Sequence, residues 1–403
     1  MLYSDSKRLL LAGLVLVLTA CGGGGSSGVA EQRVLDSTSL ATSADQASVT
    51  LLTSGSSGIS QFSGSADDTG LATVDLLVEP DASGRQPTAL QVVTESAGAI
   101  VVEHFATGAG TTLVSGEQPP DLTTAVRVDS LVNAFPYPAV GSSPALTPGT
   151  YRLFLRLAEA GAQVSGAVVF KEDDDATRGV VRANVHFVGS TTQDTESARA
   201  VRLALEQWRV VFASIGVTLE VDSFEWQQAS AILPSPTAGS RFYVDAAQAP
   251  GVSPLALNVY LGETISRNAS TDPGEEFDGV LGLSSAIPGP AVPTPKSAIA
   301  VSLAIHAGPD GAFDDREIRT LAETFAHEAG HYLGLFHPVE LRSGGGYRPG
   351  DPLSDTSDCR SEAACIESGL ADNVMFPTPV GGRDQSVFTP QQSEVVHLQA
   401  LVD

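Results

Sequence analysis

Basic residues are scarce in this chain of 403 residues, which holds 22 lysines and arginines against 47 aspartates and glutamates. The resulting formal net charge of −25 repels phosphate backbones, which argues against nucleic acid as a partner. Long apolar runs are scarce as well, because the one marked run, near the N-terminus, is too short to span a membrane as a helix. The composition is that of a soluble globular protein whose acidic residues suit the outside of a cell.

The N-terminal run has the form of an export signal. Lys7 and Arg8 precede the apolar residues 9–18, and small residues then lead to Cys21. This order is typical of a signal peptide, here residues 1–20. Its end resembles a bacterial lipobox, which implies that Cys21 becomes the lipidated first residue of the mature protein. An ordinary secretory signal with an incidental cysteine is the alternative. Both interpretations export the chain, and the first anchors it by lipid to the bacterial cell envelope, at the outer membrane or the cell surface.

Cysteine is scarce too, with three in the chain. If Cys21 is lipidated, Cys359 and Cys365 remain as an even pair with five residues between them. Beyond the reducing cytosol, such a pair predicts a disulfide. A loop this short gains about 2 kcal/mol in the chain-entropy model, so we expect the bond to hold a local loop rather than the fold.

Histidine is rare, yet three of the seven histidines fall within the stretch HEAGHYLGLFH. On a helix, His327 and His331 share one face, and Glu328 lies next to them. Gly334 allows the chain to turn back, which makes His337 a third ligand. Three neutral imidazoles leave a fourth position on zinc for water, whose pKa falls towards ~7 and whose proton Glu328 can accept. The spacing therefore predicts a hydrolytic zinc site with Glu328 as the general base.

Methionine is almost absent, since Met375 is the only one besides the initiator. It lies in ADNVMFP, downstream of the histidines. The extended histidine pattern followed by a methionine turn is the signature of the metzincin proteases. Two other interpretations stay open: a helix whose histidines only pack or cap, and a zinc-binding but inert descendant. The presence of Glu328 argues against the second.

The chain divides by pattern into two domains with a tether and a linker. Residues 21–45 are rich in glycine and serine and predict a flexible tether. Residues 46–172 predict an all-β, sandwich-like domain, and residues 173–178 an acidic linker. The β-type runs in this domain are SVTLL, ATVDLLVE, ALQVVTE, AIVVEHF, TAVRVDSL, GTYRLFLRLA and QVSGAVVF. We expect the sandwich to act as a constant spacer, and the alternative is that acidic residues 173–175 impose latency on the zinc site.

Residues 179–403 change to an α+β pattern. VRANVHFVG and VTLEVDSFEW predict strands on either side of a long amphipathic helix at residues 195–216. Three further strands are expected in LALNVYLGE, GVLGLSS and AIAVSLAI, before the helix that carries the histidines. Asp314 or Asp315 can cap that helix, with Glu317 in its first turn. The histidines outside the zinc motif that lie on strands are interpreted as structural; they are His104, His186 and His306.

This order of elements resembles a metzincin catalytic domain and is most similar to the pappalysin family. The points of likeness are LNVYLGE, GVLGLSSAIP, SDTSDC, DNVM and FTPQQ, spread over residues 180–403. The resemblance implies a zincin-like fold with a twisted mixed sheet, a long helix, the zinc helix and a Met-turn. It implies zinc on His327, His331 and His337, and Met375 beneath the metal. It also implies that an extended peptide pairs with the GVLGLSS strand.

The residue after the methionine and a cluster of aspartates are two further points of comparison with the family. A tyrosine commonly follows the Met-turn in the family, whereas Phe376 follows here, so oxyanion stabilisation would have to come from zinc or another donor. Asp351, Asp355 and Asp358 resemble a region where relatives hold calcium. An acidic chain also produces such clusters by default, so calcium as a second cofactor stays open.

The function expected from these features is a lipid-anchored zinc endopeptidase that cuts extended peptide or protein segments. The alternative is a lipid-anchored binding or adhesion protein that keeps an inactive zincin-like scaffold. A different metzincin branch, such as a matrixin-like protease, is a third interpretation, and the cysteine pair with DNVM weighs against it. Cleavage specificity and oligomeric state are left open by the sequence.

Overall fold

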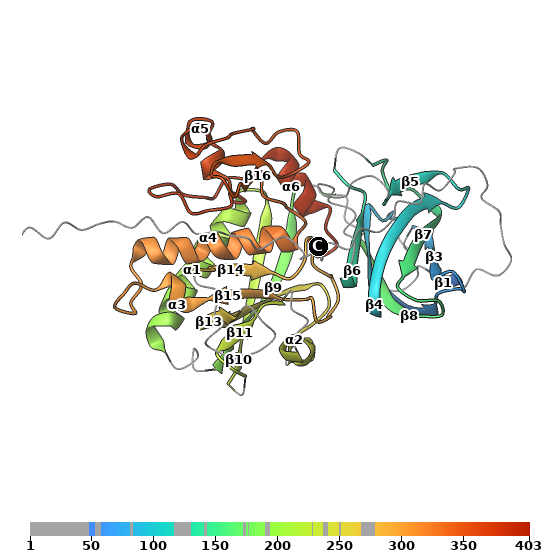
Figure 1. Ribbon diagram of the computed structural model, residues 1–403, viewed down its shortest axis with the longest axis horizontal. Helices are drawn as coiled ribbons and strands as arrows, with labels where there is room; N and C mark the ends of the chain where they lie inside the picture. Colours follow the sequence, from blue (N-terminus) through green and yellow to red (C-terminus); the bar gives the residue numbers. More distant parts are fainter. Residues whose placement is uncertain are drawn as a thin grey trace, which may run out of the picture.

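The computed structural model of the chain shows two halves, of which the first is all β and the second is mixed α and β (Figure 1). The expected signal peptide, Cys21, the expected tether and residues 173–174 lie outside the described residues. No helix in the described part of the chain is both long and apolar enough to cross a bilayer. The described residues are 48–52, 58–80, 84–116, 130–140, 143–171, 175, 177–189, 194–227, 229–236, 241–249, 251–266 and 279–403.

The N-terminal half is an eight-stranded sheet around its own apolar core. Its path runs β1-β3-β7-β4-β8-β2, and β5 and β6 also pair with β4. All of these pairs are antiparallel except β1 with β3. The strands are β1 (Ser48–Leu52), β2 (Ile59–Ser65), β3 (Leu71–Val78), β4 (Ala89–Thr107), β5 (Thr112–Ser115), β6 (Ser130–Tyr137), β7 (Gly149–Leu157) and β8 (Gln163–Lys171).

The 19-residue strand β4 organises this half. Its first part pairs with β8 and β6, whereas its second part pairs with β7 and β5. Leu90 and Val92 belong to the core of the half, as the alternation of a strand requires. Gln91 and Val93 point to the other face, yet they are 1% and 0% exposed. A strand buried on both faces needs a second cover, and the C-terminal half provides it.

The predicted boundaries of the strands in this half were partly wrong. ALQVVTE and AIVVEHF form one strand, β4, rather than two. TAVRVDSL lies outside the described residues except for its last two, Ser130 and Leu131. These two residues begin β6, which continues to Tyr137. The sequence also gave no sign of β2, because its ISQFSGS holds only two large apolar residues, Ile59 and Phe62.

The C-terminal half is built on a five-stranded sheet in the order β10-β9-β12-β15-β14. Its first four strands are parallel, and the edge strand β14 is antiparallel to β15. The mixed sheet with its helices agrees with the expected α+β class. The strands are β9 (Gly179–Val188), β10 (Val217–Trp226), β12 (Ala256–Gly262), β14 (Gly282–Ser284) and β15 (Ile299–Ser302).

Two long helices, α1 (Thr195–Ala213) and α4 (Asp315–Tyr332), share one apolar core with this sheet. Trp208 of α1 meets Phe325 of α4 with ring centroids 5.6 Å apart. The helix α4 begins at a capping box, because Asp314 accepts two backbone N–H groups of the first turn at 2.8 Å and Glu317 accepts the N–H of Asp314 at 2.7 Å. The cap is therefore Asp314.

The remaining elements are short and lie around these layers (Figure 1). They are β11 (Ile232–Pro234), α2 (Arg241–Ala246), β13 (Thr264–Ser266), α3 (Leu303–His306), β16 (Val339–Leu341), β17 (Tyr347–Pro349), α5 (Glu362–Glu367), η5 (Leu370–Asp372) and α6 (Pro390–His397).

Two buried histidines make stability depend on pH. Burial lowers the pKa of His186 and of His306 to about 4. Because the unfolded histidine titrates near ~6.5, the unfolded chain takes up protons first as the pH falls. The contribution of these two histidines to stability is therefore complete above pH ~6.5 and falls towards pH ~4, by at most ~1.4 kcal/mol per pH unit for each histidine.

We expect His186→Phe to make this acid loss shallower. The imidazole stacks on Phe224 and Tyr260 with centroids 5.3 and 4.6 Å away, so a phenyl ring fits the same stack without titrating. Urea unfolding of metal-free protein at pH 7 and pH 5 measures the change. Equal acid losses in wild type and variant would contradict the assignment.

Candidate metal centre

The helix α4 and the turn after it place the predicted ligands. His327 and His331 are one turn apart on the helix, and the helix ends just after His331. Gly334 then takes a φ of 96°, in the left-handed region that favours glycine. Its N–H donates to the carbonyl of His331 at 2.9 Å, which closes the helix end and redirects the chain towards His337. The sequence had anticipated this turn.

The three imidazoles converge on one point. The Nε2 atom of His337 lies 3.1 Å from Nε2 of His327 and 3.0 Å from Nε2 of His331. Among the described residues, these three form the group of histidine, cysteine or carboxylate side chains whose ligand atoms lie within 4.8 Å of one another. Two nitrogens bound to one zinc ion at tetrahedral angles would be roughly 3.3–3.4 Å apart. The spacing therefore fits a single ion.

Each ring is oriented by a hydrogen bond at its other nitrogen. Nδ1 of His327 lies 2.8 Å from the carbonyl of Val374, and Nδ1 of His331 lies 2.7 Å from the carbonyl of Leu335. Since a carbonyl can only accept, both Nδ1 atoms carry the proton, and the Nε2 lone pairs face the common point. Burial, and then the proximity of His337, lowers the pKa of His327 to about 3, which favours the neutral ring that a metal requires.

The third ring has a carboxylate as its partner. Nδ1 of His337 lies 3.1 Å from Oε1 of Glu340 on β16. A carboxylate that accepts the Nδ1 proton fixes the tautomer and raises the basicity of Nε2. Glu340 was missed by the sequence reasoning, although a carboxylate three residues after the last histidine was visible.

Glu328 lies in a tight space between α4 and β14. It is 7% exposed, and a Cβ on Gly282 would lie 2.7 Å from its Cγ. Burial raises the pKa of Glu328 to about 8, and the backbone N–H of Ser284, which donates to its carboxylate, opposes the rise. A cation at the imidazoles would also oppose this rise in the pKa of Glu328, because it stabilises the ionised form.

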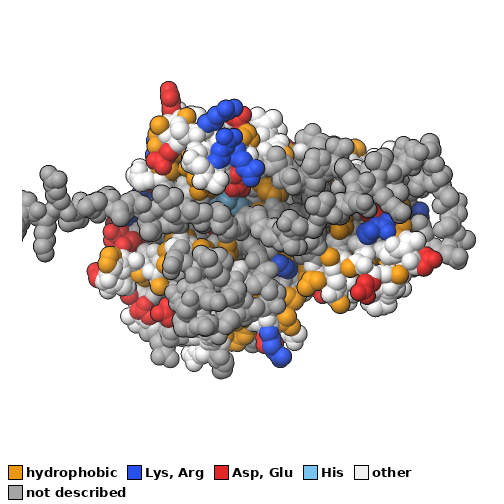
Figure 2. Space-filling model, in the orientation of Figure 1, with side chains coloured by type: hydrophobic (Ala, Val, Ile, Leu, Met, Phe, Trp, Pro, Cys, Tyr) orange, Lys and Arg blue, Asp and Glu red, His pale blue; other side chains and the backbone are white. Residues whose placement is uncertain are grey.

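A pocket opens beside the histidines and Glu328. Part of its lining comes from the edge strand β14, and part from the segment that follows Met375. Figure 2 shows histidine side chains reaching the surface in the C-terminal half. The lining residues are Leu281, Gly282, Leu283, Thr320, Glu323, Thr324, His327, Glu328, His331, His337, Val374, Phe376, Pro377, Thr378, Pro379 and Gln385.

Met375 packs directly beneath the helix. It is fully buried, and a Cβ on Gly330 would lie 2.4 Å from its sulfur. The turn is held by Asn373, whose Oδ1 accepts the N–H of Met375 at 2.9 Å and whose Nδ2 donates to Gln392 at 2.8 Å. The role of Gly330 was not predicted, because the need for a residue without a side chain at this position appears only once Met375 lies against the helix.

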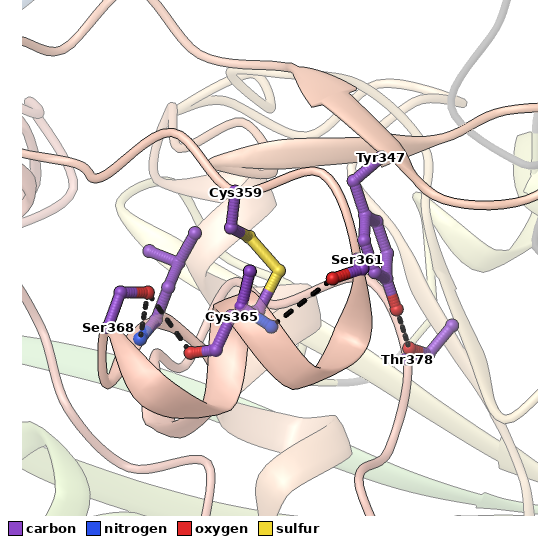
Figure 3. Close-up of a disulfide and its surroundings, with 8 residues drawn as sticks. Tyr347, Cys359, Ser361, Cys365, Ser368 and Thr378 are labelled. Atoms are coloured by element: carbon purple, nitrogen blue, oxygen red, sulfur yellow. Dashed lines mark hydrogen bonds between the residues drawn. A yellow bond between two sulfur atoms is a disulfide. The ribbon is translucent and has the colours of Figure 1, made fainter.

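The predicted cysteine pair is joined in the structure (Figure 3). Cys359 and Cys365 are buried in a small separate core that also holds Tyr347 and Phe376. The two rings have centroids 5.3 Å apart. The disulfide therefore belongs to the same small core as Phe376, the residue after Met375. Phe376 also lines the pocket.

Two of the three aspartates of the calcium prediction, Asp351 and Asp355, accept local hydrogen bonds. Asp355 accepts from Thr389 Oγ1 at 2.9 Å and from the N–H of Gln391 at 2.8 Å, at the start of α6. Burial, with a smaller contribution from Asp355 and Asp358, raises the pKa of Asp351 to about 6. These aspartates do not form a close ligand group among the described residues. Calcium stays a prediction without support from the geometry.

The comparisons with known proteins give remote likenesses only. No family model and no curated protein matches the sequence. Archaemetzincin from Methanopyrus kandleri shares 15% identity over 41% of this chain and 78% of its own, with a TM-score of 0.24. Metalloproteinase-II from Bacteroides fragilis shares 10% over 58% of this chain and 62% of its own, with a TM-score of 0.32. PliG from Salmonella Typhimurium, a periplasmic lysozyme inhibitor, shares 12% over 31% of this chain and 97% of its own, with a TM-score of 0.19. At these values the likenesses carry no argument, and function rests on the site itself.

We expect His337→Ala to lose zinc binding, and Glu340→Ala to weaken it by roughly 10–100-fold, because one removes a ligand and the other its orienting partner. Competition with a chromophoric chelator measures both. Glu362→Ala, at an exposed position on α5, is the control for loss of a carboxylate. Unchanged zinc content in His337→Ala would remove His337 from the ligand set.

Proposed function

We propose that this chain is a zinc-dependent endopeptidase that cuts extended segments of peptides or proteins. One observation carries the proposal: three neutral imidazoles direct their Nε2 lone pairs to one point, with the buried Glu328 and an open pocket beside it. Three nitrogen ligands with an adjacent carboxylate are the donor set of a hydrolytic rather than a structural zinc site.

The residues have distinct roles in this reaction. His327, His331 and His337 would hold zinc, which supplies Lewis-acid polarisation of a water molecule and of the scissile carbonyl. Glu328 accepts the proton of that water and then donates it to the departing amine. The chain has Phe376 after Met375, so no phenol from that position reaches the reacting carbonyl. Oxyanion stabilisation falls to the metal or to another donor.

The edge strand β14 supports an extended substrate. Among the described residues it pairs with β15 alone, so no strand covers its second edge, where the N–H of Ser284 donates to Glu328, and it also lines the pocket. An extended peptide can add to such an edge as a further strand. The side chain of the substrate next to the cleaved bond would then enter the pocket.

The metzincin and pappalysin assignments are part of this proposal. They are supported by the buried Met375 under α4, by the mixed sheet with β14 at its edge, and by the family likenesses in the sequence. The alternative of an inert binding or adhesion protein is not adopted, because Glu328 and the pocket are both present.

We also propose export and anchoring to the bacterial envelope, from the N-terminal sequence pattern alone. Cys21→Ser should move the protein out of the membrane fraction, since the lipid would have no thiol to attach to. Fractionation of cells with metabolic labelling by a fatty acid measures this. A wild-type protein that takes up no label, or a variant that still takes it up, would contradict lipid attachment at Cys21.

We expect Glu328→Ala to keep zinc and to lose peptidase activity by roughly 10²–10⁴-fold, because the ligands remain while the proton acceptor is gone. Metal analysis beside hydrolysis of a peptide library tests this. Glu394→Ala, an exposed carboxylate on α6, is the control. A variant at position 328 that cleaves as fast as wild type would disprove the mechanism.

A further inference from the structure

The two halves of the molecule are joined by a buried glutamine. Gln91 lies on β4, in the part of the sheet that faces the C-terminal half, and it is 1% exposed. Its Nε2 donates to the carbonyl of Gly289 at 3.0 Å, and its Oε1 accepts the N–H of Ala291 at 2.6 Å. One side chain thus pairs with the backbone on both sides of Pro290, in the way a neighbouring strand would.

The segment held by Gln91 has few backbone donors of its own, and its internal hydrogen bonds lie mainly in residues 292–297, where Ser297 donates its N–H to the carbonyl of Thr294 at 2.9 Å and its hydroxyl to the carbonyl of Val292 at 2.7 Å. Residues 285–298 connect β14 to β15 and contain four prolines, which have no N–H to donate. The N–H of Gly289 donates to the carbonyl of Tyr332 at 2.8 Å, and the hydroxyl of Tyr332 donates to the carbonyl of Pro290 at 2.8 Å. This loop therefore lies between Gln91 of the first half and Tyr332, the last residue of α4.

The loop is continuous with the part of the site that would bind a peptide. Ser285, at its start, donates its N–H to Ala298 at 3.1 Å, directly after the last residue of β14. β14 is only three residues long, and Ser284 donates its N–H to Glu328. The loop is therefore connected to α4 in two ways, directly through Tyr332 and through β14, which contacts Glu328.

Other contacts hold the first half in place beside the loop. Val169 of β8 is part of the same apolar core as α1 and α4, and Ile59 packs against that core. Lys171 is buried and donates to the carbonyl of Val402. Asp403 exchanges two backbone hydrogen bonds with Val180, at 2.6 and 3.0 Å, so the chain ends between the two halves (Figure 1). The first half is thus docked, rather than tethered by the linker alone.

We propose that the N-terminal half is a structural part of the substrate site, in which Gln91 is a positioning residue that holds β14 in register with α4. This inference rests on the proposed peptidase function for its consequence, which is a lower affinity for extended peptides when Gln91 is lost. It differs from the expectation that the sandwich is a constant spacer. A purely local role, in which Gln91 only satisfies the loop, is the competing explanation.

Hydrogen–deuterium exchange of the full chain separates the two explanations without any use of activity. Gln91→Met keeps the length of the side chain and removes both hydrogen bonds. We expect exchange at least tenfold faster at Ser285 and in β14 as well as at Ala291, with α1 unchanged. Gln61→Met, on the exposed face of β2, is the matched control and should exchange as wild type does. Faster exchange confined to Ala291 would overturn the proposal.

Kinetics with an extended peptide tests the functional consequence. For Gln91→Met we expect a KM at least tenfold higher, with kcat within threefold and zinc content unchanged. A merely unstable variant would instead lose kcat at constant KM, and that result would overturn the proposal. If wild type cleaves no peptide at all, the proposed function fails, while the exchange experiment still decides whether Gln91 holds β14.

A cut in the linker covers the case in which Gln91→Met does not fold. A site for a specific protease is inserted after residue 174 of the otherwise wild-type chain, and the folded protein is then cleaved. We expect the two pieces to elute together in size-exclusion chromatography and to keep the wild-type KM. Pieces that separate, with a C-terminal piece of wild-type KM, would overturn the proposal.

Discussion

The mutual repulsion of three nitrogen lone pairs is the constraint on which the rest of the site depends. Neutral imidazoles do not hold their Nε2 atoms 3.0–3.1 Å apart without a cation unless each ring is held from behind. The holding groups are the carbonyls of Val374 and Leu335 and the carboxylate of Glu340. Each comes from a different segment, so the Met-turn, the helix end and β16 must all be in place before the centre exists. A metal ion bound at this point would relieve the repulsion between the lone pairs, and its binding would stabilise the folded state.

Glycine provides the close approach that brings these segments to α4. Gly282 lets β14 lie against Glu328, and Gly330 lets the sulfur of Met375 lie under the helix. An added Cβ would come within 2.7 and 2.4 Å of those side chains, respectively. Gly282 is on the strand β14 and faces a side chain of α4, whereas Gly330 is on α4 itself and faces the side chain of Met375. The helix α4 is therefore packed closely from two directions, and a larger residue at either glycine would displace Glu328 or Met375.

The C-terminal half was the more predictable part of the chain, because its signals are local. The amphipathic stripe of α1, the capping box at Asp314 and the histidine spacing each depend on residues within one or two turns. The contacts made by Glu340, Gly330 and Gln392 were missed, since they depend on segments that meet only after folding. In the N-terminal half, β2 was missed because its small polar residues have little strand preference. The joining of two runs into β4 was missed because the intervening SAG reads as a turn.

Gln91 shows how a domain contact can be present in a sequence and still be misread. A strand with one face in water alternates apolar and polar residues, whereas ALQVV does not, and it is buried on both faces. That lack of alternation was the available sign that another layer covers the N-terminal sheet. The cover is needed because β14, with three residues and one neighbour, has too few ladder hydrogen bonds to stay in place by itself. Its proline-rich continuation adds few more, so the contacts from outside the sheet, with Tyr332 on one side and Gln91 on the other, add to the stability of the proposed peptide-binding edge.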